Sequence, residues 1–417
     1  MSEYYTAKTN FYGNRTPSEL IERHDGPLYV YNEEILRERC REMKRLLSYP
    51  NFKVNYSPKA NSNLELLKII KSEGLCADAM SPGEIHVLLA AGFSPNEIFY
   101  VGNNVSQSEM KYAADAGIMV SVDSVQQLAD YGSINPGGRV SVRFNAGVGA
   151  GHHEKVVTAG KNTKFGITPE FIGEVKETAK RYDLKISGIN QHIGSLFMDG
   201  KKYIAGVKPL LDIAGQFEDL DFIDLGGGFG IPYHKQDGEE RLNLKMLGEE
   251  LDTVLSKWAL QYDKNVEFKI EPGRYISAEC GVLLGTVHCV KKSFGNTYIG
   301  TDIGFNVLMR PVLYDSYHDI EVYKKGDAKG SSEQLNVTIV GNICESGDIL
   351  AKGRFLPEIK KGDIIGVMDA GAYGYSMSSN YNNRLRPAEV LIEKGGDARL
   401  IRRRETFEDI IQTFKIN

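Results

Sequence analysis

One lysine is a candidate for covalent chemistry because of its neighbours in the sequence. Lys59 follows Ser57 and Pro58, directly after the apolar, strand-like run 52–56. Most lysines are solvated surface residues, but a lysine that ends an apolar strand is a candidate for burial. A desolvated lysine has a lowered pKa and can form a Schiff base with a carbonyl compound. We therefore expect Lys59 to attach a carbonyl-bearing cofactor.

Further polar residues follow other strand-like runs at the same point, where each run ends. They are Asp78, Ser81, Asn103, Arg143, His192, Ser195, the glycine run 226–230, and the turn Glu271-Pro272-Gly273-Arg274. The carboxyl ends of parallel strands meet at one rim of a barrel, where functional groups gather. Each residue alone is weak support, but their shared position predicts a single site that includes Lys59.

The glycine run Gly226-Gly227-Gly228-Phe229-Gly230 has three interpretations. It could be a simple turn, or a nest whose backbone N–H groups hold a phosphate. The third interpretation is the dinucleotide fingerprint GxGxxG, which would need a glycine at Ile231 and a helix where Pro232 stands. A phosphate nest after a late barrel strand is common, so we favour a phosphate nest for this run.

Glu271 and His192 each have a structural and a functional interpretation. Glu271 could be a capping or surface carboxylate, or it could keep the nitrogen of a pyridine cofactor protonated. His192 could be a core histidine with satisfied hydrogen bonds, or a flat ring stacked on a cofactor. The only adjacent histidines, His152 and His153, would point apart on a strand and lack a third ligand at metal spacing, so we expect no metal site.

Two kinds of element must position these residues: short strands and amphipathic helices. Strand-like runs cover 52–56, 76–80, 98–101, 119–122, 140–144, 186–191, 222–225 and 266–270. Helical stretches follow nearly all of them, with Asn63 as a predicted N-cap and capping boxes at Ser81–Glu84 and Ser106–Glu109. This alternation over roughly 230 residues predicts a closed (β/α)8 TIM barrel.

The pattern changes after about residue 281. The runs 282–291, 335–340, 363–368 and 388–392 are strand-like, with glycine-rich turns between them. They predict a mostly antiparallel β-sandwich or β-barrel domain. We expect the TIM barrel over 32–280, and the β domain over 281–417 with 1–31 added. The polar segment 160–164, in the long loop after the fifth barrel strand, is a candidate lid.

Composition limits the class of protein. The 417 residues carry a net charge of -5, which argues against nucleic-acid binding, because that depends on concentrated positive charge. No apolar run is long enough to span a membrane, and the first residues lack the features of a signal peptide. The five cysteines form no CxxC pair and are odd in number, as is typical of free thiols in a reducing compartment. We expect a cytoplasmic protein.

Together with four further motifs, these residues resemble the fold type III PLP-dependent decarboxylases, the alanine-racemase-like barrel group. The resemblance covers about 26–392 and is strongest to the diaminopimelate decarboxylases. The motifs are 147–153 with 164–167, Arg310-Pro311 with Tyr314 and His318, Cys344-Glu345-Ser346-Gly347-Asp348, and Ala370-Gly371-Ala372-Tyr373-Gly374. Two departures, Pro58 before the lysine and Ala146 after Asn145, replace no reacting group.

The resemblance implies pyridoxal 5′-phosphate as cofactor. Lys59 then forms the Schiff base, and His192 stacks on the ring. The remaining residues implied to hold the ring and the phosphate are Ser195, Gly228, Glu271, Pro272, Gly273, Arg274 and Tyr373. The implied reaction is decarboxylation of the amino acid meso-2,6-diaminopimelate to L-lysine and CO2, the last step of lysine biosynthesis.

The resemblance also implies how the substrate is held. Arg274, Arg310, Tyr314 and Tyr373 contact it, the first three at its distal carboxylate, and Glu345 reads its distal amino group. Cys344 supplies the proton as general acid. In that family Cys344 and Glu345 come from the partner subunit, so the implied active unit is a homodimer.

Other activities on the same fold are rivals. A racemase needs a second base on the opposite face, and the pair Cys344 and Glu345 with Arg310 favours decarboxylation instead. Decarboxylases of D-ornithine, D-lysine or a glutamyl-carrier-protein intermediate should differ at Arg310, Tyr314 and Glu345, which this chain keeps. A non-catalytic PLP-binding protein usually lacks the β domain predicted after 281.

Overall fold

The computed structural model describes residues 4–147, 160, 163–325 and 333–414. It divides the chain into two compact units. We call residues 37–232 with 241–276 the barrel unit, and residues 1–36, 233–240 and 277–417 the β unit. The predicted domain bounds, 32–280 and 281–417 with 1–31, stay a prediction.

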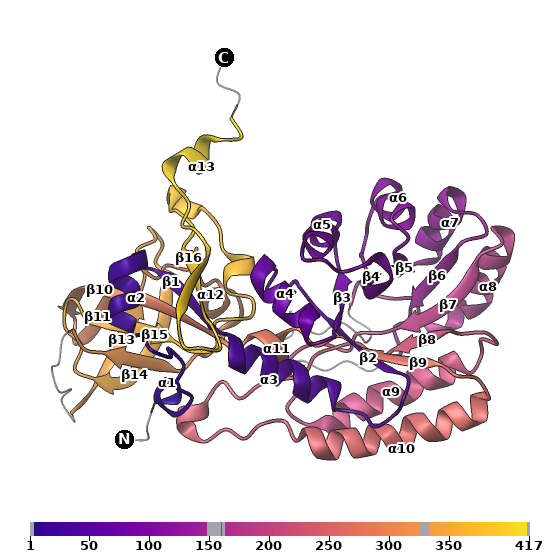
Figure 1. Cartoon of the computed structure of the whole chain (residues 1–417), viewed down its shortest axis with the longest axis horizontal. Helices are drawn as coiled ribbons and strands as arrows, with labels where there is room; N and C mark the ends of the chain where they lie inside the picture. Colours follow the sequence, from indigo (N-terminus) through magenta and orange to yellow (C-terminus); the bar gives the residue numbers. More distant parts are fainter. Residues whose placement is uncertain (1–3, 148–159, 161–162, 326–332, 415–417) are drawn as a thin grey trace. The chain divides into compact units, whose positions relative to one another are not determined.

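The barrel unit is the predicted TIM barrel. Its strands are β2 (Phe52–Tyr56), β3 (Cys76–Ala79), β4 (Ile98–Tyr100), β5 (Met119–Val122), β6 (Arg139–Arg143), β7 (Lys185–Asn190), β8 (Phe222–Asp224) and β9 (Glu267–Ile270). Each is parallel to the next, and β9 pairs with β2 to close the barrel, with Val54 opposite Ile270. All strand-like runs predicted for the barrel are confirmed (Figure 1).

Helices follow the barrel strands as expected. They are α4 (Leu64–Ser72), α5 (Pro82–Ala90), α6 (Gln107–Asp115), α7 (Val125–Ile134), α8 (Ile172–Arg181), α9 (Gly200–Ala214) and α10 (Leu244–Tyr262). The N-cap at Asn63 and the capping box at Ser106 are confirmed. The predicted capping box at Ser81 is only partly present. The Ser81 side chain caps α5, but the Glu84 carboxylate accepts from the backbone N–H of Met80, at 2.7 Å, and not from that of Ser81. Glu84 therefore fixes the end of β3 as well as the helix start.

The β unit contains one extended sheet that is mostly antiparallel, as predicted. The strand order is β14-β13-β11-β10-β1-β16-β17, and β15 pairs with both β10 and β12. The strands are β1 (Leu28–Asn32), β10 (Gly281–Ser293), β11 (Asn296–Thr301), β12 (Ile320–Tyr323), β13 (Gln334–Val340), β14 (Ile349–Pro357), β15 (Ile364–Val367), β16 (Ala388–Ile392) and β17 (Ala398–Arg402). Only β1 with β16 and β11 with β13 run parallel among the described pairs.

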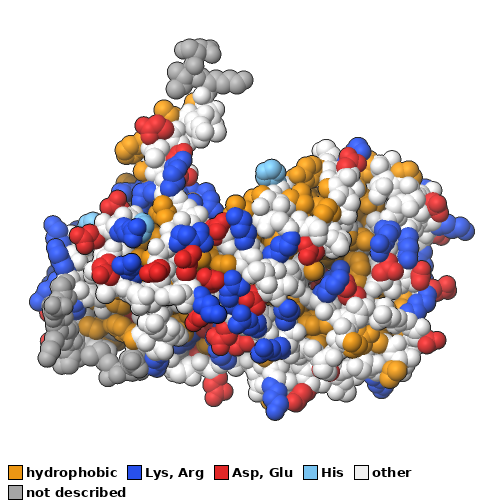
Figure 2. All heavy atoms as spheres, viewed as in Figure 1, with side chains coloured by type: hydrophobic (Ala, Val, Ile, Leu, Met, Phe, Trp, Pro, Cys, Tyr) orange, Lys and Arg blue, Asp and Glu red, His pale blue; other side chains and the backbone are white. Residues whose placement is uncertain are grey.

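Short helices complete the chain. They are α1 (Tyr5–Lys8), α2 (Pro17–His24), α3 (Glu33–Lys44), α11 (Arg274–Ser277), α12 (Arg310–Tyr314) and α13 (Phe407–Ile411). Among the described residues, no helix combines the length and the apolar composition needed to cross a bilayer. On the face shown in Figure 2, Lys and Arg side chains alternate with Asp and Glu.

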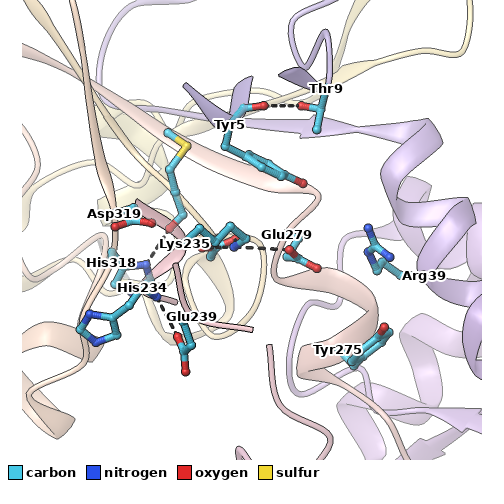
Figure 3. A network of polar contacts seen from close by, with 12 residues as sticks. Tyr5, Thr9, Arg39, His234, Lys235, Glu239, Tyr275, Glu279, His318 and Asp319 are labelled. Carbon is cyan, nitrogen blue, oxygen red and sulfur yellow. Dashed lines mark hydrogen bonds and ion pairs between the residues drawn. The ribbon is translucent and has the colours of Figure 1, made fainter. Parts of the chain in front are cut away.

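A buried ion cluster lies within the β unit (Figure 3). The Lys235 ammonium donates to both carboxylate oxygens of Asp369, at 2.6 and 2.7 Å, and lies 3.3 Å from Glu279 Oε1. Both carboxylates are buried. Burial raises the pKa of Asp369 to about 6, and the charge of Lys235 opposes that rise. Lys235 belongs to the segment 233–240, which lies between two barrel segments in the sequence. The cluster therefore attaches this segment to the β unit.

Candidate active site

Lys59 lies in a tight turn after β2. The backbone N–H of Ala60 donates to the carbonyl of Ser57, at 3.1 Å, which closes the turn 57–60. Pro58 takes the second position of this turn, where its fixed φ is favoured. The departure from the family pattern at Pro58 therefore suits the local backbone. The Ser57 N–H also donates to the carbonyl of Pro272, at 3.3 Å, so the lysine turn is joined to the turn after β9.

Asp78, at the end of β3, lies under the lysine turn. Its Oδ2 accepts a hydrogen bond from Ser57 Oγ, at 2.5 Å, and the side chain is fully buried. Burial raises the pKa of Asp78 well above its ordinary value, the charge of Glu271 adds to the rise, and the charge of Lys59 opposes it. Burial therefore favours the protonated form of Asp78 more than it would for an exposed aspartate. Here residues that end or follow β2, β3 and β9, three of the strand ends predicted to converge, lie together.

His192, after β7, lies against residues that follow the next two strands, β8 and β9. Its Nδ1 accepts from the backbone N–H of Gly227, at 3.2 Å, and lies 3.8 Å from Glu271 Oε2. Because Nδ1 accepts, the proton of the neutral ring belongs on Nε2. Burial lowers the pKa of His192 to about 4, against the opposing effect of Glu271. His192 is thus a neutral, flat ring at neutral pH.

The glycine run after β8 passes very close to Glu271. A Cβ added at Gly227 would lie 2.0 Å from the carbonyl oxygen of Glu271, and one at Gly228 would lie 2.5 Å from that of Gly194. Gly226 and Gly228 also have φ of 78° and 106°, where side chains are strained. The backbone N–H of Gly228 makes no hydrogen bond with any described residue. A backbone N–H without a protein acceptor can donate to a bound anion such as a phosphate.

These residues fit pyridoxal 5′-phosphate. Glu271 is 4% exposed, and its Oε1 has no hydrogen-bond partner in the described part of the chain. Such a buried acceptor suits the protonated nitrogen of a pyridine ring. For a phosphate there are the N–H of Gly228 and the pair Arg274 and Ser195, in which Arg274 Nη2 donates to Ser195 Oγ at 3.0 Å. The arrangement therefore offers a ring site and a phosphate site beside Lys59.

Other predicted residues lie in the β unit. Arg310 is 2% exposed, and its Nη1 donates to Nε2 of His318, at 2.8 Å. The Nδ1 of His318 must donate to the Met368 carbonyl, 2.7 Å away, which fixes Nε2 as the acceptor. The guanidinium also stacks on the Tyr233 ring, at 4.6 Å. Arg310 is therefore rigidly oriented. Tyr314 is half-buried at the end of α12.

Tyr373 and the pair Cys344 and Glu345 lie on separate loops of the β unit. Tyr373 is half-buried and adopts a positive φ of 56°. Cys344 and Glu345 are exposed on the loop between β13 and β14. Within this unit, neither makes a hydrogen bond or ion pair with Arg310, Tyr314 or Tyr373.

The long loop after β6 is described only at its ends. Residues 148–159 and 161–162, which include most of the 147–153 motif and part of the predicted lid 160–164, lie outside the described residues. At the base of the loop, Asn145 Oδ1 accepts from the backbone N–H groups of Gly147 and Gly160, at 3.1 and 2.9 Å. Asn145 thus ties the two ends of the loop together.

Sequence reasoning missed Asp224 and undervalued Glu84. Asp224 is fully buried at the end of β8, and its Oδ1 accepts from the Gly226 N–H at 2.9 Å. Burial, with the charge of Glu271, raises its pKa well above the ordinary value. Burial also raises the pKa of Glu84, and the charge of Lys59 opposes the rise. A carboxylate that ends an apolar run was the available signal for Asp224.

Comparisons with known proteins agree on one family. Residues 33–278 match the family model described as pyridoxal-dependent decarboxylase, pyridoxal binding domain. The chain is 41% identical to a diaminopimelate decarboxylase of Methanothermobacter thermautotrophicus, over 96% of this chain and 94% of that protein. It is 34% identical to the diaminopimelate decarboxylase of Escherichia coli K12, over 92% and 93%.

Solved structures agree with this match. The crystal structure of diaminopimelate decarboxylase from Helicobacter pylori complexed with L-lysine has a TM-score of 0.87 and 31% identity, over 95% of this chain and 98% of that one. A lysine/ornithine decarboxylase from Vibrio vulnificus complexed with putrescine has a TM-score of 0.77, over 90% and 96%, but only 21% identity. The second likeness shows a shared fold and nothing more.

Proposed function

Because the chain belongs to the pyridoxal-dependent decarboxylases, in the diaminopimelate decarboxylase family, we propose that it decarboxylates meso-2,6-diaminopimelate to L-lysine and CO2. This reaction is the last step of lysine biosynthesis. The observation that carries the cofactor chemistry is the buried Oε1 of Glu271, which has no partner among the described residues. The substrate assignment is supported by relatives that share this activity in their names over almost the whole chain.

The barrel unit supplies the cofactor residues. When bound, pyridoxal 5′-phosphate supplies an electron sink for the charge that CO2 loss leaves on the substrate Cα. Lys59 holds the cofactor through Nζ and yields it to the substrate amine. Glu271 keeps the ring nitrogen protonated through Oε1, and neutral His192 stacks against the ring. The lowered pKa of His192 supports this role, because a neutral ring adds no positive charge beside a protonated pyridine.

The phosphate is bound by groups around the glycine run. We assign it to the N–H of Gly228, the hydroxyl of Ser195, and the turn Glu271-Pro272-Gly273-Arg274, together with Tyr373. The hydrogen bond from Arg274 to Ser195 supports this assignment, since it places a cationic group beside a hydroxyl. Arginine suits phosphate recognition because its planar fork can donate two parallel hydrogen bonds.

The substrate residues are those that the family resemblance implies. Arg274, Arg310, Tyr314 and Tyr373 contact the substrate, and the first three bind its distal carboxylate. The fixed orientation of Arg310 by His318 and Tyr233 supports this role. Glu345 binds the distal ammonium. After the bond between Cα and the departing carboxylate breaks, the Cys344 thiol gives its proton to Cα, and solvent restores that proton.

The active unit is a homodimer in which Cys344 and Glu345 serve the substrate of the partner chain. Their exposure supports this, because a general acid needs shelter from bulk water that an exposed loop does not give alone. The five cysteines are all free thiols, which supports a reducing, cytoplasmic location. Mixing inactive Lys59→Ala and Cys344→Ala chains tests the sharing. Restored activity is expected, and no restoration refutes a shared site.

A CO2-release screen tests the proposed function. The substrates are meso-, LL- and DD-diaminopimelate, lysine and ornithine, and we expect turnover of the meso isomer with L-lysine as product. Lys59→Ala should abolish both turnover and the visible absorbance of the lysine-bound cofactor. Lys53→Ala is the matched control, because Lys53 lies on the same strand with its side chain half exposed. Preference for another substrate would refute the assignment.

A further inference from the structure

A short segment, residues 379–384, which we call the brace, contacts the exposed loop that carries Cys344 and Glu345. Tyr381 donates its hydroxyl hydrogen to Glu345 Oε1, at 2.6 Å. The backbone N–H of Cys344 donates to Asn382 Oδ1, at 2.9 Å, and Arg384 Nη2 donates to the carbonyl of Asn342, at 3.0 Å. The brace therefore contacts the loop at three points.

The brace is itself anchored to the β unit. The Tyr381 ring stacks on Phe305, with ring centres 5.6 Å apart and an angle of 24° between the planes. The backbone N–H of Ser379 donates to the carbonyl of Asn306, at 2.8 Å, and the Asn380 amide donates to Glu405, at 2.6 Å. Tyr381 is 44% exposed, but the stacking fixes the direction of its hydroxyl.

Asn382 has a backbone conformation that few residues adopt. Its φ and ψ are 55° and 24°, in the left-handed region, where asparagine is tolerated better than most side chains. In this conformation its side-chain oxygen accepts the Cys344 N–H. The residue thus combines the turn conformation with the acceptor. Glycine would supply the turn conformation alone, whereas aspartate would supply both the turn conformation and the acceptor.

The brace leaves one side of Glu345 available. Tyr381 occupies Oε1, while Oε2 makes no hydrogen bond or ion pair with any described residue. A carboxylate with one oxygen fixed and the other open is oriented to receive a cation. A long, exposed glutamate without this contact would spread over many rotamers and lose that orientation.

We propose that Tyr381 and Asn382 are positioning residues for the decarboxylation. Tyr381 orients Glu345 toward the distal ammonium of the substrate, and Asn382 fixes the backbone of Cys344 and with it the thiol. This inference rests on the proposed function, because it needs the roles assigned there to Glu345 and Cys344. Tyr381 therefore governs binding of the distal amine, whereas Asn382 governs the proton transfer.

Inhibition by two product analogues tests the Tyr381 role. L-lysine carries the distal amine, and 6-aminohexanoate is the same molecule without it. In Tyr381→Phe the inhibition constant of lysine should rise roughly tenfold, because a hydrogen bond to a charged group is lost, while that of 6-aminohexanoate stays unchanged. Tyr112→Phe, an exposed tyrosine in the barrel unit, is the control. Equal changes for both inhibitors, or no change, would overturn the Tyr381 role.

Three substitutions at one position test the Asn382 role. Asn382→Gly keeps the backbone conformation and removes the acceptor, so kcat should fall roughly tenfold with little change in KM. Asn382→Asp keeps the acceptor and should retain kcat, while Asn382→Ala loses both properties and should be slowest. Wild-type kcat in the glycine variant would overturn the role. A wild-type enzyme that does not turn over meso-diaminopimelate refutes the proposed function itself, a result separate from any variant.

Discussion

Two groups of buried carboxylates, one in each unit, differ in the partners that they have. In the barrel unit, Asp78 and Glu271 each keep one buried carboxylate oxygen without a hydrogen-bond partner among the described residues. In the β unit, Asp369 and Glu279 share the ammonium of Lys235, which donates to both oxygens of Asp369. Asp78 and Glu271 each lack a hydrogen-bond donor for one oxygen, whereas Asp369 and Glu279 are paired with a lysine of their own unit.

This difference separates a binding site from a structural cluster. A buried acceptor without a donor lowers stability by about 1–3 kcal/mol, and it persists where a ligand will supply the donor. The carboxyl rim of the barrel has this character, and the pKa of Asp78 and of Asp224 is raised mainly by burial. The Lys235 cluster needs no ligand. Substitutions that remove one charge from each group should therefore have opposite effects on stability.

The largest effect is expected from Lys235→Met. Removing the ammonium leaves two buried carboxylates unpaired, which should lower the free energy of unfolding by about 3–5 kcal/mol. Urea unfolding followed by circular dichroism measures it. Lys53→Met is the control, because its ion pair with Glu267 involves a half-exposed lysine, and such pairs contribute about 0–1 kcal/mol. Similar small losses in both variants would show that the cluster is not structural.

A smaller loss is expected from Gly227→Ala. The new methyl would overlap the carbonyl of Glu271, so the glycine run or the turn 271–274 must move. Overpacking of this kind lowers stability by about 1–3 kcal/mol, and here it should also weaken cofactor binding, measured by fluorescence titration. Gly173→Ala in α8, where nothing lies within 4 Å of the new Cβ, is the control. Unchanged cofactor affinity would contradict a rigid cradle.

The smallest effect should have the opposite sign. Asp78→Asn should raise the stability of the cofactor-free protein at pH 7 by about 0.5–2 kcal/mol, at the expense of activity. Folding raises the pKa of Asp78, so the wild type loses stability as pH rises above the unfolded value, about 3.9. The gain should therefore shrink as pH falls toward about 4. Thermal unfolding across this range is the measurement, and destabilisation at pH 7 would contradict the contrast between the units.

The barrel and its rim could be predicted from the sequence because their signals are local. Short apolar runs mark the strands, and the residue after each run marks the rim, which is how His192 and Glu271 were found together. Strands such as β14, with Lys352, Gly353 and Arg354 inside it, lack an apolar run and were missed. The Lys235 cluster was missed for a different reason. Lys235 and Asp369 lie 134 residues apart, and no motif near either residue indicates the other.

The place of β1 in the β sheet has a consequence for synthesis of the chain. β1 lies between β10 and β16, and Leu28 pairs with Ala388. Ribosomes add about 5–20 residues per second, so the first strand made waits on the order of tens of seconds for its parallel neighbour. Until β10 and β16 are made, the edges of β1 are unpaired backbone ladders, open to strands of other chains. The nascent protein is therefore most exposed to aggregation while the barrel is being made, and slower translation of residues 37–387 should increase its need for a chaperone.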